Sequence, residues 1–554
     1  MKIRNKLYPY KLLLLLFKEA GLIKSSLLIL LNSISTILEI LGVTIIFSFL
    51  FSKDNIFLKN ILNNNIELGF LLLILIISFR SVILSLIEIK NDSLNFIFEK
   101  KLRIKFIEKI LFCNYTDLSQ IQRGELLSCS LSEINKTIVA FQQAIKLFQS
   151  LLSIAIFLAL ANSQSKEVIF LISIALSCSL FAFYLKPIKS WELGTLKSNI
   201  SAKLHTLIGD GLIGLKTIKA YNAESWFLSK LKIQYIDLKK IVFEFINRNA
   251  IFRSSRDVFI IVSISLWFYL NRGQLDKEQI ALQLYIVFRL SNLIGNIIQT
   301  QKNYILFITS YEKLRNVSQK MHLINKNNFK FINKESEILT QIKWAFDPRG
   351  GNKSHKFIMK KHSILAISGP SGIGKTNLID RFVGIVSPCN GKWNFETSNK
   401  KMEFVGEEDI LQLRKYISYC PQDVILFEGS LIENLLINGF DDIQKSREEV
   451  EELIKYWFQR LNLDYLLKSY KNFDQMMELS ISKLSGGETK RLGLIRSFLL
   501  DRQIEVYDEP SSNLDKYNVK KVNQILVERA KKKFIIVATH DQKLLTKANK
   551  IFKL

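Results

Sequence analysis

One segment, Gly369–Thr376 with the sequence GPSGIGKT, constrains the fold of this chain more than any other. An apolar run at 363–368 precedes it, and a helical pattern at 377–386 follows it. Glycines in such a turn let backbone N–H groups point inward, and the N-terminus of the next helix adds a positive dipole. The segment therefore predicts a strand–loop–helix unit of a parallel α/β sheet that cradles phosphate groups.

The residues of this loop predict what it holds. Lys375 is long enough to reach the β- and γ-phosphates of a nucleoside triphosphate, and the hydroxyl of Thr376 suits Mg²⁺. Further contacts to the phosphates are expected from Gly369, Ser371, Gly372, Gly374 and Asn377. A chance match in a glycine-rich turn is the alternative, and the strand and helix on either side weigh against it.

Two later strands are predicted to end in charged side chains. The run IEVYDEP leads to Asp508 and Glu509, and FIIVATHD leads to His540. The C-terminal ends of parallel strands meet at the edge of the sheet where ligands bind. Asp508 is expected to hold the Mg²⁺ shell, and Glu509 to orient or deprotonate an attacking water. His540 is expected to contact the γ-phosphate. The alternative for the two acids is that they simply face solvent at the end of a strand. The alternative for the histidine is that it is a core residue whose hydrogen bonds are all made within the protein.

The first three hundred residues carry most of the long apolar runs, and 48% of the whole chain is hydrophobic. Spans of about 20 mostly apolar residues cross a membrane. Six candidates are found, near 25–52, 66–89, 144–163, 167–187, 257–271 and 278–300. The long loops at 90–143 and 188–256 are rich in Lys and Arg, which predicts that they and both termini are cytoplasmic. This predicts a multi-pass protein of the cell membrane.

The net charge of +27 has two explanations. A nucleic-acid binder would gather its basic residues in one patch with interleaved aromatic residues. A membrane protein instead keeps Lys and Arg on its cytoplasmic side. The basic residues here are spread over the predicted cytoplasmic loops, so no nucleic-acid partner is expected. The five cysteines stand far apart, which argues against a disulfide framework or a zinc site.

Several segments together resemble the ABC transporters of the exporter type, in which a membrane domain precedes an ATPase domain on one chain. They are ISYCPQDVILFEGSLIENLL with Gln422 as the Q-loop residue, LSGGE as the signature, SNLD ending in Asp515 as the D-loop, and His540 as the switch histidine. Phe346 in IKWAFD stands where the family has an aromatic residue against adenine. Upstream, RGELLS at 123–128 and GLKTIKAYNAES at 214–225 resemble cytoplasmic segments of the family's membrane domain.

The resemblance implies ATP and Mg²⁺ as cofactors, with Gln422 near both the metal and the attacking water. It implies a fold with a six-span α-helical membrane domain, long cytoplasmic helices, and an α/β P-loop ATPase domain with a helical subdomain. The expected boundaries are 1–315 for the membrane domain, 316–340 for a linker and 341–554 for the ATPase domain.

The resemblance also implies a dimer. In the family, two ATPase domains pack head to tail, so that Ser485, Gly486 and Gly487 of one subunit close over the ATP held by the other. A homodimer is the simplest case, and pairing with a paralogous half-transporter is the alternative. The chain departs from the family at Asn377, where a hydroxyl residue is usual, and before the signature, where 474–483 lacks a glycine-rich coupling segment.

The expected function is ATP-driven export or flipping of an amphipathic substrate such as a lipid, a lipid-linked glycan, a drug or a peptide. The alternatives are an ATP-gated channel or receptor, which Glu509 weighs against, and an importer subunit, which the fused domains weigh against. The N-terminal residues show no protease-like pattern, which weighs mildly against an exporter that also cleaves a peptide leader.

Ionisable residues inside the predicted spans are candidates for the substrate path. Glu39 and Arg80 are expected at similar depth, so they can pair, and Arg289 and Asn292 are further candidates. One hypothesis is a wet cavity of basic character for an amphipathic or anionic substrate. The other is a purely structural network between helices.

Overall fold

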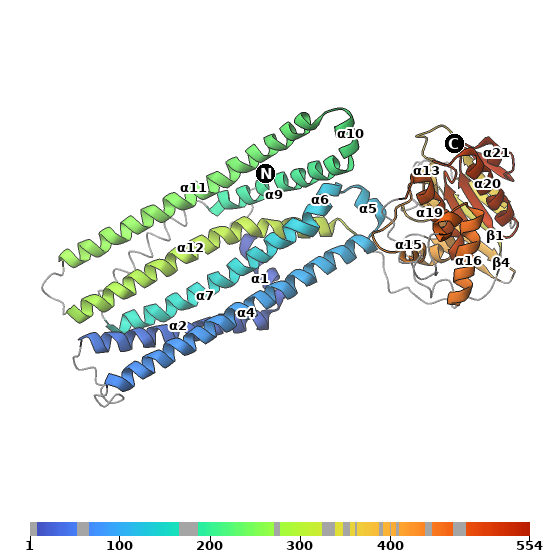
Figure 1. Cartoon of the computed structure of the whole chain (residues 1–554). Coiled ribbons are helices and arrows are strands. Elements are labelled where there is room, and N and C mark those ends of the chain that lie inside the picture. Colours follow the sequence, from blue (N-terminus) through green and yellow to red (C-terminus); the bar gives the residue numbers. More distant parts are fainter. Residues whose placement is uncertain are drawn as a thin grey trace. The chain divides into compact units, whose positions relative to one another are not determined.

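The computed structural model describes residues 8–51, 66–164, 187–270, 277–323, 338–346, 355–360, 363–386, 392–398, 400–405, 409–437, 446–468 and 484–554. The chain divides into two compact units. The first consists of Met1–Leu111 and Gln120–Met321, and the second of Phe112–Ser119 and His322–Leu554. Figure 1 shows long helices in the first unit and mixed helices and strands in the second.

Helices make up the described part of the first unit. In chain order they are α1 (Tyr8–Ala20), α2 (Leu22–Phe51), α4 (Ile66–Phe112), α6 (Arg123–Ser128), the π-helical turn η1 (Cys129–Glu133), α7 (Ile134–Gln164), α9 (Pro187–Ile213), α10 (Leu215–Ala220), α11 (Glu224–Leu270) and α12 (Lys277–Gln319). At 1.5 Å per residue, a 47-residue helix such as α4 is about 70 Å long. The apolar spans therefore continue as helices well beyond any bilayer core.

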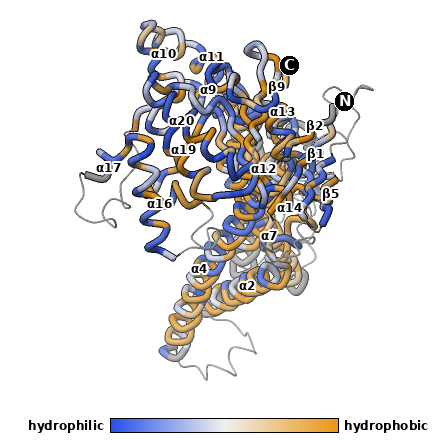
Figure 2. Tube along the Cα trace, turned by 90° about the vertical axis from the view of Figure 1, so that its right-hand side faces the viewer, coloured by the Kyte–Doolittle hydropathy of each residue, from blue (hydrophilic) through white to orange (hydrophobic). Residues whose placement is uncertain are grey.

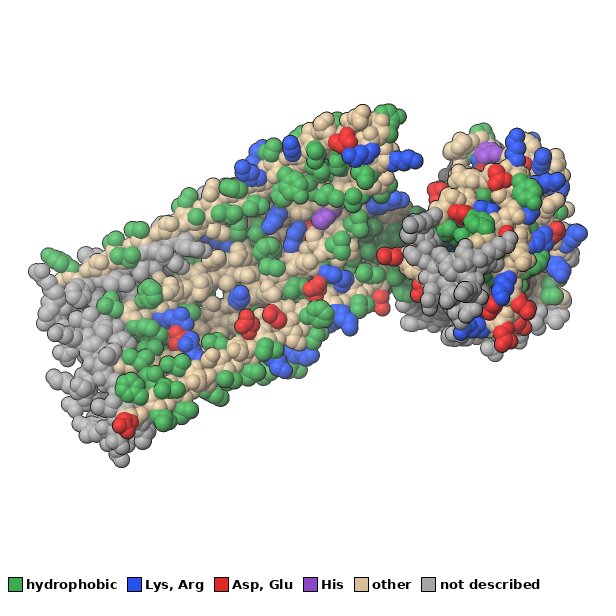
Figure 3. All heavy atoms as spheres, viewed as in Figure 1, with side chains coloured by type: hydrophobic (Ala, Val, Ile, Leu, Met, Phe, Trp, Pro, Cys, Tyr) green, Lys and Arg blue, Asp and Glu red, His purple; other side chains and the backbone are tan. Residues whose placement is uncertain are grey.

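Helix α12 packs along α7 and α9, and α2 packs on α7. Phe157 of α7 and Ile286 of α12 are fully buried in the core between these helices, together with Leu290 and Ile294. In contrast, only 6% of the most apolar stretch of α4 is buried. Figure 2 shows that stretch as a continuous orange segment, and Figure 3 shows hydrophobic side chains spread over the outer helices. Apolar side chains exposed on this scale indicate a lipid-facing surface.

Three helical stretches among the described residues are long and apolar enough to cross a membrane. They are Leu22–Ile46, Gly69–Phe112 and Arg123–Ala159. They contain most of each of the first three predicted spans. The predicted span at 167–187 lies outside the described residues except for Pro187, which begins α9. The fifth and sixth fall on α11 and α12. The six-span count therefore stays a prediction.

The second unit is built on a five-stranded parallel sheet in the order β6-β7-β8-β3-β9. Its strands are β3 (Ser363–Ser368), β6 (Ile417–Cys420), β7 (Ile504–Asp508), β8 (Phe534–Ala538) and β9 (Lys550–Lys553). Every residue of β7 and β8 is buried, as expected for parallel strands covered on both faces. The parallel α/β sheet predicted from the apolar runs is thus confirmed.

A second, antiparallel sheet has the order β2-β1-β4-β5. Its strands are β1 (Leu339–Phe346), β2 (His355–Lys360), β4 (Lys392–Thr397) and β5 (Lys401–Val405). The sequence analysis did not anticipate this sheet. In β4, Trp393, Phe395 and Thr397 alternate with less buried residues, which is the pattern of a sheet with one covered face.

Helices fill the space around the two sheets. They are α13 (Lys375–Phe382), α14 (Ile410–Leu413), the 3₁₀ turn η3 (Arg414–Tyr416), α15 (Leu431–Leu435), α16 (Arg447–Arg460), α17 (Asp464–Lys468), α19 (Gly486–Leu500), α20 (Lys516–Ala530) and α21 (Gln542–Leu545). Among them, α16 and α19 pack on each other through Trp457 and Phe498, whose ring centroids lie 4.6 Å apart. This packing forms the helical subdomain that the family resemblance implies.

The short helix α5 (Tyr115–Ser119) belongs to the second unit although it follows α4 in the chain. The backbone N–H of Asn114 donates to the carbonyl of His322 at 3.3 Å. The backbone N–H of His322 in turn donates to the Asp117 carboxylate at 2.9 Å. Helix α5 is therefore tied to the segment that leads into β1.

We predict that Arg529→Ala lowers the free energy of unfolding of the second unit by about 3–5 kcal/mol, because it leaves the buried Glu505 carboxylate uncompensated. Arg529 Nε donates to both carboxylate oxygens of Glu505, at 3.0 and 2.9 Å, and the Glu505 side chain is fully buried. Thermal unfolding of the full chain checks the prediction, with the exposed Lys532→Ala as the matched control. Equal melting temperatures for the two variants would contradict it.

Candidate nucleotide site

The loop between β3 and α13 has the backbone shape that its glycines predict. Gly372 has φ of 79° and Gly374 has φ of 107°, which is the left-handed region. No atom lies within 4 Å of the position that a Cβ would take at either residue, so backbone conformation and not space requires glycine here. Gly374 is the N-cap of α13, so the free N–H groups of that helix face the loop. The loop and helix terminus together form an anion cradle.

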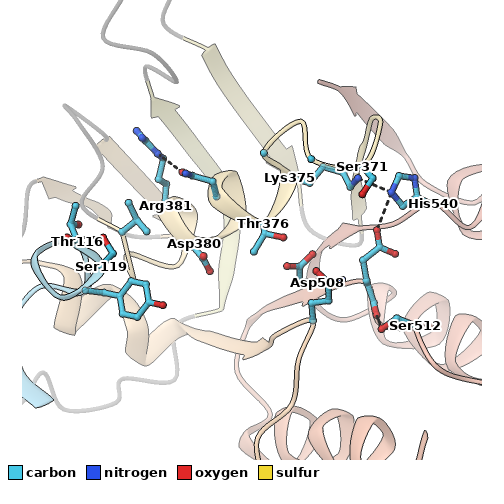
Figure 4. A pocket seen from close by; sticks show the side chains of 17 residues that line it. Thr116, Ser119, Ser371, Lys375, Thr376, Asp380, Arg381, Asp508, Ser512 and His540 are labelled. Atoms are coloured by element: carbon cyan, nitrogen blue, oxygen red, sulfur yellow. Dashed lines mark hydrogen bonds and ion pairs between the residues drawn. The ribbon is translucent and has the colours of Figure 1, made fainter. Parts of the chain in front are cut away.

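Lys375, the first residue of α13, is buried beneath the loop. Its Nζ lies 3.0 Å from the carbonyl of Gly369, 3.2 Å from that of Pro370 and 2.7 Å from Nε2 of His540. The ammonium donates to the two carbonyls. The P-loop lysine and the histidine at the end of β8 therefore meet, although 165 positions separate them in the chain. Figure 4 shows these two side chains converging.

Asp508 ends β7 with its carboxylate facing the start of α13. Both carboxylate oxygens are buried, and neither has a hydrogen-bond partner of ordinary geometry among the described residues. Burial raises the pKa of Asp508, while the Thr376 hydroxyl and Lys490 act to lower it. A buried carboxylate with open oxygens beside a hydroxyl is the donor set that Mg²⁺ prefers. The residues present therefore fit the metal site expected from the sequence.

Glu509 follows with φ of 45°, an uncommon conformation for a residue other than glycine. Its backbone N–H donates to the carbonyl of Ala538 at 2.9 Å, and its own carbonyl accepts from the Ser512 hydroxyl at 2.9 Å. These bonds hold the strained turn in place. The carboxylate is directed toward His540, with Oε1 3.4 Å from Nε2. Burial raises the pKa of Glu509, with His540 and Lys375 opposing the shift.

Lys490 of α19 connects three parts of the site through hydrogen bonds to their backbone. It is buried, and its Nζ donates to the backbone carbonyls of Pro421 and Gln422 at 2.9 Å each, and to that of Asp508 at 3.1 Å. Burial lowers the pKa of this lysine. One ammonium thus fixes the Gln422 segment, the end of β7 and the helix that begins at the signature. The role of Lys490 could not be predicted from the sequence, because its partners are backbone atoms of segments far away in the chain.

A cavity of about 870 Å³ lies over these groups. Most of the predicted site residues line it: Ser371, Gly372, Gly374, Lys375, Thr376, Asn377, Gln422, Asp508, Glu509 and His540. Thr116 and Ser119 of α5, Asp380, Arg381 and Ser512 also line it and were not predicted. The side chain of Asn377 accepts a hydrogen bond from Arg381 Nε at 2.9 Å, so the residue that departs from the family pattern is held within its own helix.

The remaining predicted residues do not line this cavity. Ser485 caps α19 in a capping box with Glu488, and its side chain is exposed. A Cβ on Gly487 would lie 3.2 Å from the carbonyl of Asn513, so the signature and the D-loop touch. Asp515 caps α20 by accepting from the N–H groups of Tyr517 and Asn518, and these bonds lower its pKa. Phe346 is the last residue of β1. The predicted segment at 474–483 lies outside the described residues.

The family model described as ABC transporter matches residues 353–512, which contain the loop, the Gln422 segment, the signature and both acids. Residues 353–512 therefore form an ABC transporter domain. Such a domain implies ATP binding, and the phosphate loop, Gln422 and both acids that line the cavity lie within the matched residues. The family resemblance drawn from the motifs is thereby confirmed.

Several curated proteins are similar to this chain. The lactococcin-G-processing and transport ATP-binding protein LagD of Lactococcus lactis is 25% identical over 64% of this chain and 50% of its own length. The transport/processing ATP-binding protein ComA of Streptococcus pneumoniae is 23% identical over 81% of this chain and 62% of its own. The mitochondrial iron-sulfur clusters transporter ATM1 of Candida glabrata is 27% identical over 55% and 42%. The chain thus spans about half the length of these relatives.

A solved structure of a bacterial Atm1-family ABC exporter with ATP bound is similar to this chain over nearly its whole length. The TM-score is 0.75 with 97% of this chain and 93% of that chain covered, at 14% sequence identity. The two share a fold, with a helical domain followed by an ABC ATPase domain. The coarse fold class is therefore confirmed.

We predict that Lys490→Ala lowers kcat for ATP hydrolysis by about tenfold or more, since three buried carbonyls lose their donor. KM for ATP is expected to change little, because Lys490 supports Gln422 and Asp508 from behind and does not line the cavity. Steady-state kinetics of the full chain measures both constants, with the exposed Lys532→Ala as a control. A change confined to KM would contradict this positioning role.

Proposed function

We propose that this chain is half of an ATP-driven exporter, in which ATP hydrolysis in a dimer drives a substrate across the cell membrane. The observation that carries the proposal is the convergence of Lys375, Glu509 and His540 over the open Asp508 carboxylate. These groups come from three different strand ends. Their arrangement suits phosphoryl transfer, which depends on positioning and charge stabilisation.

The chain's own residues divide the work as follows. Backbone N–H groups around Gly372 and Gly374 bind the phosphates, and Lys375 neutralises the β- and γ-phosphates. Glu509 orients or deprotonates the attacking water, since a buried carboxylate of raised pKa is a stronger base than an ordinary glutamate. His540 contacts the γ-phosphate. Glu509 also favours a hydrolysing transporter over an ATP-gated channel.

Asp508, Thr376 and Gln422 would hold Mg²⁺ close to the phosphates, where the ion would neutralise charge that develops during transfer. Phe346 would stack on the adenine. Gly369 and Ser371 complete the phosphate loop, and Asn377 extends it through its backbone N–H.

Two copies of the chain are needed for a complete site. Within one chain Ser485, Gly486 and Gly487 stand exposed or half-exposed at the start of α19 and do not line the cavity over Lys375. A helix N-terminus with free N–H groups suits a phosphate. We infer that these residues, with Asp515 nearby, close over the ATP of a second copy or of a paralogous half-transporter. ATP then favours the closed dimer, and hydrolysis removes that preference.

The apolar helices place the first unit in a membrane, and the basic loops favour a cytoplasmic position for both termini and the ATPase domain. The names of the relatives describe a lactococcin-G-processing and transport protein, a transport/processing protein and an iron-sulfur clusters transporter. They support an exported solute, and they widen the expected substrate beyond lipids and lipid-linked glycans.

We predict that Glu509→Gln lowers the ATPase rate by about 10²–10⁴-fold, the usual contribution of a positioned general base. ATP binding is expected to persist, because the phosphate loop is untouched. ATPase rates in lipid nanodiscs and binding of a fluorescent ATP analogue measure the two properties. An unchanged rate would remove Glu509 from the mechanism.

The ordinary pKa of a glutamate side chain is about 4.3. We expect kcat to fall on the acidic side at a pH above this value. The base acts when deprotonated, so activity rises with pH through the raised pKa of Glu509 and is lost as pH falls through it. His540 contacts the same carboxylate, and His540→Gln separates the two groups. The acidic fall in kcat persists in the residual activity of that variant if Glu509 is responsible, and its disappearance would contradict the assignment.

A further inference from the structure

A second cavity, of about 480 Å³, lies within the first unit among α2, α4, α7 and α12. Helices α2, α7 and α12 each turn a largely polar face toward it, and α4 contributes Arg80 and Leu84. The stripe on α12 runs from Arg289 to Asn303 at steps of three or four residues, which is one face of a helix about 21 Å long. The residues that line the cavity are Asn32, Ser35, Thr36, Glu39, Arg80, Leu84, Gln143, Lys146, Gln149, Ser150, Ser153, Arg289, Leu293, Asn296, Gln299, Thr300 and Asn303.

An ion cluster closes one part of this cavity. Oε2 of Glu39 lies 2.7 Å from Nη2 of Arg80 and 2.7 Å from Nη2 of Arg289. The pairing of Glu39 with Arg80 that the sequence predicted is therefore confirmed, and Arg289 joins it from α12. The Glu39 side chain is 12% exposed, whereas the two arginines are 31% and 34% exposed. Within this cluster the carboxylate is therefore enclosed, whereas the two guanidinium groups are open to the cavity.

The charges in the cluster do not balance. One carboxylate serves two guanidiniums, which leaves a net charge of about +1 at a depth where ions are costly. Lys146 of α7 adds a further positive charge to the lining of the same cavity, and it has no ion-pair partner among the described residues. The buried Nε atoms of Arg80 and Arg289 also have no hydrogen-bond partner there. The lining therefore keeps hydrogen-bond donors and positive charge in excess, which an anionic ligand can satisfy.

The rest of the lining indicates a hydrophilic occupant. Leu84 and Leu293 are the only aliphatic side chains among the 17 described lining residues. The others are amides, hydroxyls and ions, which suit a solvated polar molecule and would leave acyl chains without apolar contact. The lining therefore argues against a lipid tail in this cavity.

We propose that this cavity binds the carboxylate or phosphate groups of a hydrophilic solute, and that Arg80, Arg289 and Lys146 supply the positive charge. The inference rests on the proposed export function, because it identifies the chemical class of the exported solute. It narrows the amphipathic substrate expected from the sequence to an anionic, water-soluble one. An acidic peptide segment satisfies these requirements.

The test is binding of triglutamate, with triglutamine as the neutral match, to the full chain in nanodiscs by isothermal titration calorimetry. Saturating ADP and Mg²⁺ are present, so that the phosphate loop is occupied. Triglutamate is expected to bind and triglutamine to bind at least about tenfold more weakly, as expected for charge-assisted hydrogen bonds. A tripeptide of phosphoserine, measured alongside, shows whether carboxylate or phosphate fits better.

Lys146→Glu is the decisive variant because this side chain is exposed and its change does not open the ion cluster. It is expected to weaken triglutamate binding by about tenfold or more, and Lys100→Glu, an exposed position on α4 outside the cavity, to leave it unchanged. Glu39→Gln is expected to act in the opposite direction and strengthen binding, since it frees both arginines. Equal binding of the two peptides, no binding of either, or equal effects of the two lysine variants would overturn the proposal.

ATP hydrolysis measured on the same nanodisc preparations, without ADP, keeps this inference apart from the proposed function. Hydrolysis that Glu509→Gln abolishes, together with charge-independent peptide binding, would overturn the cavity assignment alone. Absence of hydrolysis under every condition, together with charge-dependent binding, would overturn the transport cycle and leave the cavity as an anion site.

Discussion

The parallel pairing of β3 with β8 and of β8 with β7 is the constraint on which the ATP site depends. The register aligns Ile367 with Ala538 and Ala538 with Asp508, so the three strands end at the same level. Each strand end delivers one part of the chemistry: the phosphate loop after β3, the two acids at β7 and the histidine after β8. Because the strands are buried on both faces, a shift of any one of them would break the sheet core as well as the site. The stability of the sheet and the geometry of the site therefore depend on the same hydrogen bonds between strands.

The helical unit is organised by a different constraint, the cost of ions away from water. Glu39 of α2 pairs with Arg80 of α4 and Arg289 of α12, so this cluster connects three helices. The same cluster shapes a polar cavity whose excess charge is positive. If the helices change their packing during transport, the number of partners available to Glu39 changes as well. An anionic solute and the Glu39 carboxylate would then compete for the same guanidiniums, which provides a physical basis for release.

The sequence predicted the parallel sheet and most of the ATP site because continuous apolar runs end at glycine, acid and histidine residues. It also predicted the Glu39–Arg80 pair from their equal depth. It could not place Arg289 in that pair, since the rotation of α12 depends on packing against α7. The sequence did not indicate Lys490, because this residue bonds to backbone carbonyls and no side-chain pattern reveals such partners. It did not indicate the antiparallel sheet, because the strands of that sheet are short and are separated by long connections. The signature residues Ser485–Gly487 were predicted at ATP, and in a single chain they lie outside the cavity.

In the proposed dimer, the P-loop of one copy and the signature of another form one composite site. Complementation between two inactive variants, Lys375→Ala and Ser485→Arg, tests this arrangement. The two are co-expressed with different tags, and mixed dimers are isolated by tandem affinity purification and assayed for ATP hydrolysis. Each mixed dimer contains one composite site with both parts intact and one with neither. Mixed dimers are expected to hydrolyse ATP, whereas neither variant alone is expected to do so. No hydrolysis by mixed dimers, or full activity of Ser485→Arg alone, would contradict it.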